Sequence, residues 1–235
     1  MPRTREQNEI IRKKTKERIL GSALGLYVKY GYPGTVMERV ASEAGLAKGL
    51  LYYYYKDKNR MFRDLFDTMI ERISAESEKA FAKTEGKDPL ARLVGYSAEI
   101  FGMGMKDPRS IMFAMRMPFD AYAVFGEEGW EKGMLGSGIH TRNLENIIRE
   151  GASDGTFCCR DAALSAAAYW TVYVAGLFKF VRMMDGEGSR RGKDEGDVFR
   201  QLIAFGMAGL GVDRDKWEVV LEAIMKEKEN EDIQK

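Results

Sequence analysis

Apolar residues return every three or four positions along most of this chain, the spacing that places them on one face of an amphipathic helix. The first helix predicted in this way has the inward-facing residues Ile19, Ala23, Leu26, Tyr27 and Tyr30. Gly31 is placed to end it, because glycine accepts the left-handed conformation found after many helices. The dipeptide Pro33-Gly34 then predicts a turn.

A second short helix is predicted between Thr35 and Gly45. Thr35 stands three residues before Glu38, so we expect the hydroxyl and the carboxylate to form a capping box at the start of this helix. Gly45 breaks the pattern and opens a four-residue turn that leads into a third helix. Two short helices joined by a glycine-containing turn match the helix-turn-helix, which places its second helix in the major groove of DNA.

The third helix, from Lys48 to Tyr55, carries four consecutive tyrosines. Leu51 and Tyr55 share one face at helical spacing, and we expect both to pack inward. The outward positions offer a positive charge, room for close approach, an apolar contact for thymine methyl groups and hydroxyl donors for phosphates. These positions are Lys48, Gly49, Leu50, Tyr53 and Tyr54. The structural alternative is a tyrosine-rich core helix in a small three-helix bundle.

A fourth, longer helix is predicted from Asp57, whose carboxylate suits an N-cap, to about Lys83. Its inward stripe comprises Phe62, Leu65, Phe66, Met69 and Ile73. The first turn adjoins the helix-turn-helix and the far end enters the rest of the chain. We therefore expect this helix to transmit movement between the two parts. The pattern then breaks, and Pro89 suits the first position of the next helix.

The segment from Leu90 to Met117 is rich in methionine and aromatic residues, and Asp107-Pro108 divides it into two helices. Methionine fills irregular gaps and adapts to varied ligands, so we expect an apolar cavity for a small organic molecule, with aromatic residues of a later helix beside it. The candidate ligand-binding residues are Tyr96, Phe101, Met103, Met112, Met115, Trp170 and Tyr173. Ordinary core packing is the alternative for each methionine.

The glycines between Pro118 and Gly138 predict a mobile connection, followed by a helix at 137–153. Another helix is predicted at 161–184. Its residues 162–178 carry no charge, and we expect them to be buried in protein rather than to cross a membrane. A glycine-rich, disordered loop is predicted at 185–196.

Two further helices are predicted at 197–211 and 216–228. The helix at 161–184 has two apolar faces and therefore needs two partners. We expect the domain core or a ligand to cover one face and a second subunit to cover the other. The helices at 161–184 and 197–211 are accordingly expected to form a homodimer interface.

The net charge of +1 over 235 residues conceals a strong asymmetry. Residues 1–63 hold 14 Lys and Arg against 6 Asp and Glu, a net charge of +8, and the remainder holds 23 basic and 30 acidic residues, a net charge of −7. A basic N-terminal segment followed by an acidic remainder fits a protein whose N-terminal part binds a polyanion. Residues 1–18 are expected to be either a basic arm that reaches DNA or a disordered, solvated tail.

Few of the remaining residues suggest a metal site, a redox role or catalysis. Cys158 and Cys159 are adjacent, a spacing that rarely meets disulfide geometry, so we expect reduced thiols in the cytoplasm, with a redox switch as the open alternative. The sole histidine, His140, has no partner at ligand spacing, so we expect no metal and no cofactor. The charged N-terminus lacks the apolar core of a secretory signal. Phosphate-binding, dinucleotide-binding and nucleophile motifs are absent, so we expect no enzyme.

Residues from 19 to 58 resemble the N-terminal domain of tetracycline-repressor (TetR) type regulators. The residues that carry the resemblance are Ile19, Ala23, Leu24, Gly31, Tyr32, Thr35, Val40, Ala41, Ala44, Gly45, Leu46, Lys48, Gly49, Leu51, Tyr52, Tyr53, Tyr54, Tyr55 and Lys58. The resemblance implies that phosphates are held by Thr35, Tyr53, Tyr54 and Lys58. It also implies that the bases lie along Lys48, Gly49, Leu50 and Tyr52. Two positions depart from the family: Ala47 stands in place of a capping serine or threonine, and Tyr54-Tyr55 replaces a frequent His-Phe pair.

The same resemblance implies an all-α protein with a three-helix helix-turn-helix DNA-binding domain at 1–60 and a helical bundle for ligand binding and dimerisation at 61–235. The expected function is that of a transcriptional repressor: a homodimer binds a palindromic operator with its recognition helices ~34–36 Å apart. A small apolar or aromatic effector then shifts the fourth helix and releases the DNA. The alternative is a ligand-independent architectural DNA-binding protein, whose second domain serves dimerisation alone.

Overall fold

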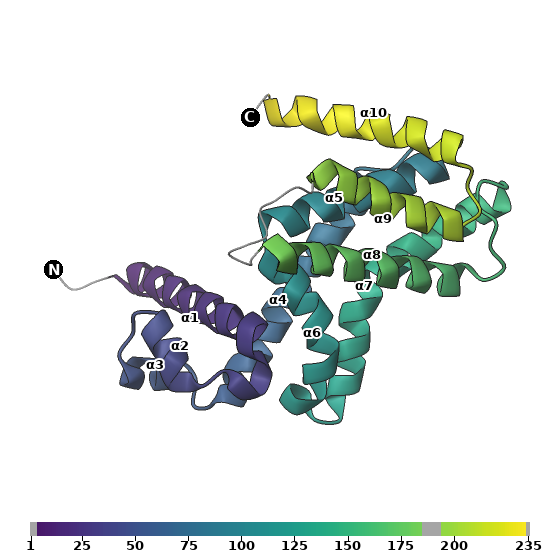
Figure 1. Ribbon diagram of the computed structural model, residues 1–235. Coiled ribbons are helices and arrows are strands. Elements are labelled where there is room, and N and C mark those ends of the chain that lie inside the picture. Colours follow the sequence, from purple (N-terminus) through teal and green to yellow (C-terminus); the bar gives the residue numbers. More distant parts are fainter. Residues whose placement is uncertain (1–3, 185–193, 234–235) are drawn as a thin grey trace. The chain divides into compact units, whose positions relative to one another are not determined.

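The computed structural model describes residues 4–184 and 194–233, which form ten helices and no strand (Figure 1). The predicted all-helical class is therefore confirmed. In chain order the helices are α1 (Arg5–Gly34), α2 (Met37–Glu43), α3 (Lys48–Tyr54), α4 (Lys58–Ala82), α5 (Pro89–Lys106), α6 (Pro108–Phe125), α7 (Glu128–Ser153), α8 (Ala162–Met184), α9 (Glu195–Gly209) and α10 (Arg214–Ile233). Most of the loop predicted at 185–196 lies outside the described residues.

The chain divides into two compact units. The first combines the described residues up to Arg72 with Met112–Gly136, and the second combines Ile73–Ile111 with the described residues from Ser137 onward. Helices α4, α6 and α7 each contribute residues to both units. The unit that contains residues up to 60 therefore also contains the next part of α4 and most of α6.

Helix α1 begins at Arg5, so the basic residues from Arg5 to Arg18 are helical and do not form a disordered tail. Thr4 caps this helix: its hydroxyl accepts a hydrogen bond from the N–H of Gln7 at 3.2 Å, and Gln7 Oε1 accepts one from the N–H of Thr4 at 3.1 Å. This capping box satisfies two N–H groups at the helix start. No glycine or proline follows before Gly21, so the helix continues into the predicted apolar face.

The junction between α1 and α2 differs from the expected capping box. Gly31 has φ +70° and ψ −179° and kinks the chain near the end of α1. Thr35 is fully buried, and its hydroxyl donates to the carbonyl of Gly31 at 2.8 Å. Because that hydroxyl serves the end of α1, the N-cap of α2 falls on Val36, which has no side-chain oxygen. The predicted capping box of Thr35 and Glu38 is wrong.

Tyr27 stands at the centre of the aromatic core of the first unit. Its ring lies edge-on to Phe62 and Phe66, with 5.5 Å between centroids in each case, and 5.8 Å from Phe113. All four side chains are fully buried. Edge-to-face aromatic packing adds to the hydrophobic gain of burial, so this cluster ties α1 to α4 and α6 within the unit.

Residues 118–138, expected to be a mobile connection, are mostly helical. Helix α6 continues through Pro118 to Phe125, Gly126 turns the chain at φ +67°, and α7 begins at Glu128. Proline inside a helix removes one backbone hydrogen bond. Ala121, Val124 and Phe125 are buried in the part of α6 that follows the proline, and this burial offsets the loss. The glycines of this stretch therefore misled the prediction, since only Gly126 breaks the helix before Glu128.

The other predicted helix ends agree with the structure. Asp57 Oδ1 accepts a hydrogen bond from the N–H of Arg60 at 2.7 Å, and Asp88 Oδ1 accepts one from Ala91 at 3.0 Å. Each contact caps the start of a helix, as expected for aspartate at these positions. The helices predicted at 161–184, 197–211 and 216–228 correspond to α8, α9 and α10.

In the second unit α5 packs against α10, and α8 packs against α9. The α8–α9 contact is close because residue 206 is glycine: a Cβ atom there would collide with the ring of Tyr169. Leu177 of α8 and Ile203 and Met207 of α9 are fully buried beside this contact. The two helices therefore form one layer with little space between their backbones.

A hydrogen-bonded polar cluster lies in the core of the second unit. The Tyr96 hydroxyl is 2.7 Å from His140 Nδ1 and 2.5 Å from Ser77 Oγ, and the Asn143 amide donates to Ser77 Oγ at 3.1 Å. The His140 ring stacks on Trp170, with 4.1 Å between centroids. Burial lowers the pKa of His140 to about 3 and raises the pKa of Tyr96 to about 12. Both groups are therefore neutral at pH 7.

We expect Gly31→Ala to lower the free energy of unfolding by about 1–3 kcal/mol, because its backbone conformation is essentially restricted to glycine. A Cβ atom would also lie 2.7 Å from the guanidinium of Arg116. The matched control is Gly25→Ala in the same helix, where no atom lies within 4 Å of the added carbon, and which should be neutral or stabilising by up to about 1 kcal/mol. Urea unfolding followed by circular dichroism compares the two, and equal stabilities would contradict the expectation.

The buried His140 predicts a loss of stability in mild acid. Below pH 6.5 the unfolded chain takes up a proton on this histidine while the folded chain, with a pKa of about 3, does not. The free energy of unfolding should therefore fall by about 1.4 kcal/mol per pH unit, or about 2 kcal/mol at pH 5. His140→Gln removes the chain's sole histidine. Its destabilisation relative to the parent, measured by urea unfolding, should be about 2 kcal/mol smaller at pH 5 than at pH 7; equal values would exclude this linkage.

Candidate functional site

Helix α2, a turn at Gly45 and helix α3 form the helix-turn-helix. Gly45 has φ +60°, and the N–H of Leu46 donates to the Ala41 carbonyl at 2.9 Å across the turn. Leu51 is fully buried and Tyr55 is 2 % exposed, as their spacing predicted. These two side chains anchor α3 and leave its opposite side on the surface.

Most of the residues expected to contact DNA lie on that exposed side. The exposed residues are Lys48, Gly49, Leu50, Tyr52 and Tyr53. Tyr53 is 76 % exposed, and Tyr54 is half-buried with its ring edge-on to Tyr53 at 5.5 Å between centroids. A cation, an apolar side chain and phenol hydroxyls are the groups that base edges and phosphates accept.

Thr35 and Lys58 are less accessible than the exposed residues of α3. The Thr35 side chain is fully buried and its hydroxyl is already donated, so the prediction that this side chain holds a phosphate is wrong. Lys58 is half-buried: its Nζ donates to the Pro33 carbonyl at 3.3 Å and lies 4.3 Å from the Tyr32 ring centroid. Burial lowers the pKa of Lys58, an effect that Asp120 opposes. The ammonium group has three N–H donors, and this bond to Pro33 uses one of them.

Glu38 of α2 and Lys48 of α3 form an ion pair on the exposed face, with 2.6 Å between Oε1 and Nζ. Their hydrogen bond lowers the pKa of Glu38 and raises the pKa of Lys48, so both groups remain charged. We expected Glu38 to cap α2 instead. Helical spacing identifies pairs within one helix, and these two residues lie on different helices, so the sequence carried no signal for the contact.

A second network holds the end of α3 against α1 and α4. Lys16 Nζ donates to Asp64 Oδ2 at 2.8 Å, and the Tyr55 hydroxyl donates to the same oxygen at 3.0 Å. Burial raises the pKa of Asp64, but the hydrogen bonds from Lys16 and Tyr55 outweigh it, and the pKa lies below its usual range. Lys16 and Asp64 are 48 positions apart, so their contact was not predictable from spacing.

The seven expected ligand-binding residues fall into different parts of the structure. Met112 and Met115 belong to the first unit, and the other five belong to the second. Within the second unit Tyr96 and Trp170 both contact His140, and the rings of Trp170 and Tyr173 lie 6.3 Å apart. Tyr96 thus belongs to the polar core cluster, Trp170 stacks on it, and Tyr173 lies next to Trp170.

Phe101 and Met103 lie elsewhere on α5. Phe101 packs on Phe199 of α9 with 5.2 Å between centroids, and both line a hollow of about 200 Å³ that also involves α10. Met103 is half-buried. The expected set thus divides within the second unit. Phe101, five positions after Tyr96, points to a different side of α5, and Met103, seven positions after Tyr96, lies two turns further along the helix.

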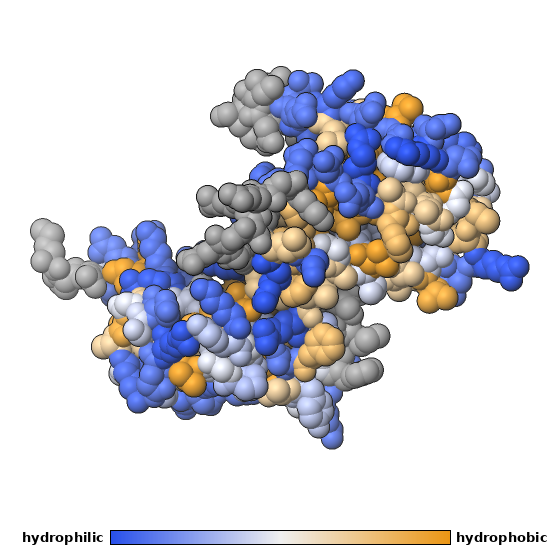
Figure 2. Space-filling view, in the orientation of Figure 1, coloured by the Kyte–Doolittle hydropathy of each residue, from blue (hydrophilic) through white to orange (hydrophobic). Residues whose placement is uncertain are grey.

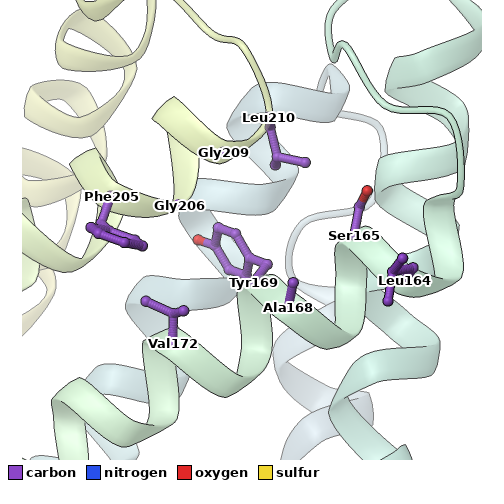
Figure 3. A pocket seen from close by; sticks show the side chains of 9 residues that line it. All are labelled: Leu164, Ser165, Ala168, Tyr169, Val172, Phe205, Gly206, Gly209 and Leu210. Carbon is purple, nitrogen blue, oxygen red and sulfur yellow. The ribbon is translucent and has the colours of Figure 1, made fainter.

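A further hollow of about 210 Å³ lies between α8 and α9 (Figure 3). Tyr169 lines it from α8, and the large side chains of Leu164 and Phe205 lie beside it, 68 % and 66 % exposed. Figure 2 shows hydrophobic residues gathered on the face where α8 and α9 lie. Exposed apolar side chains grouped around a hollow are typical of a surface that a partner covers.

Within the described part of the chain, α8 is the one helix long and apolar enough to cross a membrane, over Ala162–Met183. In its most apolar window 44 % of the residues are buried inside the protein. Among residues 4–184 and 194–233 no group of three or more His, Cys, Asp or Glu is arranged to hold a metal ion. Cys158 and Cys159 are free thiols.

Residues 19–65 match the family model described as bacterial regulatory proteins, tetR family. The uncharacterized HTH-type transcriptional regulator YhgD of Bacillus subtilis (strain 168) is 31 % identical over 65 residues, which cover 28 % of this chain and 34 % of that protein. The HTH-type transcriptional repressor KstR of Rhodococcus jostii (strain RHA1) is 30 % identical over 109 residues, 43 % of this chain and 50 % of that protein. The chain thus spans between a third and a half of the length of these relatives.

The transcriptional regulator FadR from Bacillus subtilis, solved in complex with stearoyl-CoA, shares the fold with a TM-score of 0.62. The likeness covers 82 % of this chain and 98 % of that chain at 16 % identity, so it concerns the fold alone. The match over residues 19–65 coincides with the helix-turn-helix whose geometry is described above. Residues 19–65 therefore form a helix-turn-helix that matches the tetR family of bacterial regulatory proteins, within an all-helical chain that shares its fold with a solved transcriptional regulator.

Proposed function

We propose that this protein is a ligand-responsive transcriptional repressor that binds a palindromic operator as a homodimer and leaves it when a small apolar or aromatic effector binds. The observation that carries the proposal is the anchoring of α3. Leu51 and Tyr55 hold the helix from one side, while Lys48, Leu50 and Tyr53 remain exposed on the other. A short helix held in this way can enter a major groove with its first turn against the base edges.

The DNA contacts of the proposal combine two classes. Lys48, Gly49, Leu50 and Tyr52 would lie along the bases, and Tyr53, Tyr54 and Lys58 would hold phosphates. The excess of basic over acidic residues in positions 1–63 supports this assignment, because phosphate neutralisation supplies most of the affinity. The helical start of α1 adds a basic surface to the same unit.

The dimer interface is proposed on α8 and α9. Leu164 and Phe205 expose large apolar surfaces beside the hollow between these helices, and a second copy would bury both. An interface of this kind is self-complementary about a twofold axis, so two helices from each copy form a four-helix contact. The same axis would set the two recognition helices on successive turns of DNA.

The effector site is proposed around the polar core cluster of the second unit. Tyr96, Trp170 and Tyr173 supply aromatic walls, and His140 and Ser77 supply uncharged hydrogen-bonding groups. This lining suits a neutral molecule with a flat apolar body, because a buried charge without a partner would be costly. FadR, which shares the fold, was solved with stearoyl-CoA, so the fold accommodates an organic ligand in at least one relative.

Helix α4 is the proposed route from effector to DNA. It runs without a break from Lys58 to Ala82, and its residues belong to both compact units. An effector that binds one conformation of the protein, with α4 in one place, more tightly than another would shift the populations of the two conformations. The size of the shift is set by the difference in binding free energy, typically ~1–3 kcal/mol. We assign residues 1–60 to DNA binding and 61–235 to effector binding and dimerisation.

The alternative is a ligand-independent architectural DNA binder, and the hydrogen-bonded aromatic cluster favours the repressor because dimerisation alone needs no such core. The named relatives are transcriptional regulators, and the proposal involves no catalysis. Its site of action is the bacterial chromosome, which implies a cytoplasmic location.

Lys58→Ala and Tyr53→Phe should weaken operator binding in distinguishable ways. The plot of log affinity against log salt has a slope near −0.9 per neutralised phosphate, so Lys58→Ala should make it shallower by about one. Tyr53→Phe removes an uncharged donor and should lower affinity by roughly threefold to tenfold without changing the slope. Lys216→Ala, a charge change in the second unit, serves as the control and should change neither quantity. A complex insensitive to salt would contradict the proposed interface.

Phe205→Asp should convert the dimer to a monomer, because a carboxylate would be buried against apolar side chains at the proposed interface. Sedimentation velocity at micromolar concentration measures the change, and operator affinity should fall by at least tenfold because the two half-sites are then bound separately. The control is Val219→Asp on α10, a side chain of similar exposure (69 %) that does not line the hollow between α8 and α9. Retention of the dimer in the Phe205 variant would place the interface elsewhere.

A further inference from the structure

Glu38 and Lys48 place a hydrogen-bond acceptor and a donor side by side on the exposed face of the helix-turn-helix. Oε1 and Nζ are 2.6 Å apart, and the side chains are 55 % and 62 % exposed. Glu38 is the second residue of α2 and Lys48 the first of α3, so the pair bridges the two helices. Lys48 Nζ also lies 5.8 Å from the ring centroid of Tyr52, which keeps the pair on the outward side of α3.

Folding gains from Glu38 in the first turn of α2, where a carboxylate interacts favourably with the helix dipole, but general attraction to DNA does not account for a negative charge at this place. An ion pair this exposed adds little to stability, because water and salt screen it. A negative charge on a surface that approaches phosphates opposes binding to every sequence alike. A base edge that donates a hydrogen bond to the carboxylate would reverse this penalty at selected sequences only.

The major groove presents such an edge at each G·C pair. Guanine offers the acceptors N7 and O6, and cytosine offers the amino group at N4. O6 and N4 are hydrogen-bonded to each other and are therefore about 2.9 Å apart. The 2.6 Å between Nζ and Oε1 is close to this spacing, so one ion pair matches one base pair, donor against O6 and acceptor against N4.

We propose that Glu38 is a specificity-determining residue, which accepts a hydrogen bond from the N4 amino group of a cytosine whose paired guanine is contacted by Lys48. The inference rests on the proposed DNA-binding function. In the reversed G·C pair the carboxylate faces the guanine acceptors, and when thymine replaces the cytosine it faces the acceptor O4. Both exchanges bring two acceptors together, so Glu38 selects the orientation of the pair as well as its identity.

Other acidic side chains near the motif provide a contrast. Asp57 accepts the N–H of Arg60 at the start of α4 and is occupied there. Glu43 is exposed at the far end of α2. The substitution Glu43→Ala therefore changes the charge of the same helix by the same amount as Glu38→Ala, away from Lys48, and serves as the matched control.

The test removes one functional group from the protein, the Glu38 carboxylate, and one from the DNA, the cytosine amino group. Operator duplexes are first selected from a random library with the unmodified protein, and base preferences are measured at each position for the parent, Glu38→Ala and Glu43→Ala. At one position per half-site the parent and Glu43→Ala should prefer C·G over T·A and G·C by about tenfold, and Glu38→Ala by less than about threefold. Replacing that cytosine by 2-pyrimidinone, which lacks the amino group, should weaken the parent about tenfold and Glu38→Ala far less.

Glu38→Gln keeps an acceptor oxygen and should retain part of the preference. Thermal unfolding by circular dichroism verifies that each variant is folded. The inference is overturned if Glu38→Ala changes the affinity for all duplexes by one common factor and leaves every base preference intact, since the carboxylate then acts by charge alone. A parent protein that binds no duplex at any salt concentration is a different outcome, and it would overturn the proposed function together with this inference.

Discussion

The proposed DNA-binding surface depends on the burial of Leu51 in α3 and of Tyr55 directly after it. This helix has seven residues, and a helix of that length is not stable by itself in water. Leu51 and Tyr55 fix it to the rest of the first unit, and the Tyr55 hydroxyl shares Asp64 Oδ2 with the Lys16 ammonium. The packing of α1 and α4 therefore determines how α3 presents its outward side chains. The basic charge of the unit can act on DNA only because this inner face is held by apolar contacts and one shared carboxylate.

The polar groups of the two units lie in different environments. The first relies on exposed charge, which water and salt screen and which attracts a polyanion over many sequences. The second buries uncharged polar groups, where each hydrogen bond must be satisfied because an unpaired group in the core is costly. Tyr96, His140 and Ser77 meet this condition among themselves. A ligand at the proposed effector site would have to replace those bonds, so its polar groups would be constrained more tightly than its apolar body.

Helix positions followed from the sequence wherever a local signal existed. Asp57 and Asp88 cap helices as expected, Gly45 turns the chain, and Leu51 and Tyr55 face inward. In each wrong prediction, another contact in the folded protein outweighed the preference of the local motif. The Thr35 hydroxyl serves the Gly31 carbonyl instead of α2, and Pro118 remains inside α6 because Ala121, Val124 and Phe125 after it are buried.

The sequence by itself determined the all-helical class, the helix-turn-helix, the side of α3 that faces outward and the separation of basic and acidic regions, because these depend on spacing and composition along the chain. The tertiary structure decided which residues meet. Glu38 reaches Lys48, Lys16 reaches Asp64, and Tyr96 reaches His140 only after helices pack at particular angles and offsets. Periodicity establishes which face of a helix is buried, but it carries no information on the neighbouring helix or its register. Contacts between distant helices therefore remained open until the fold was known.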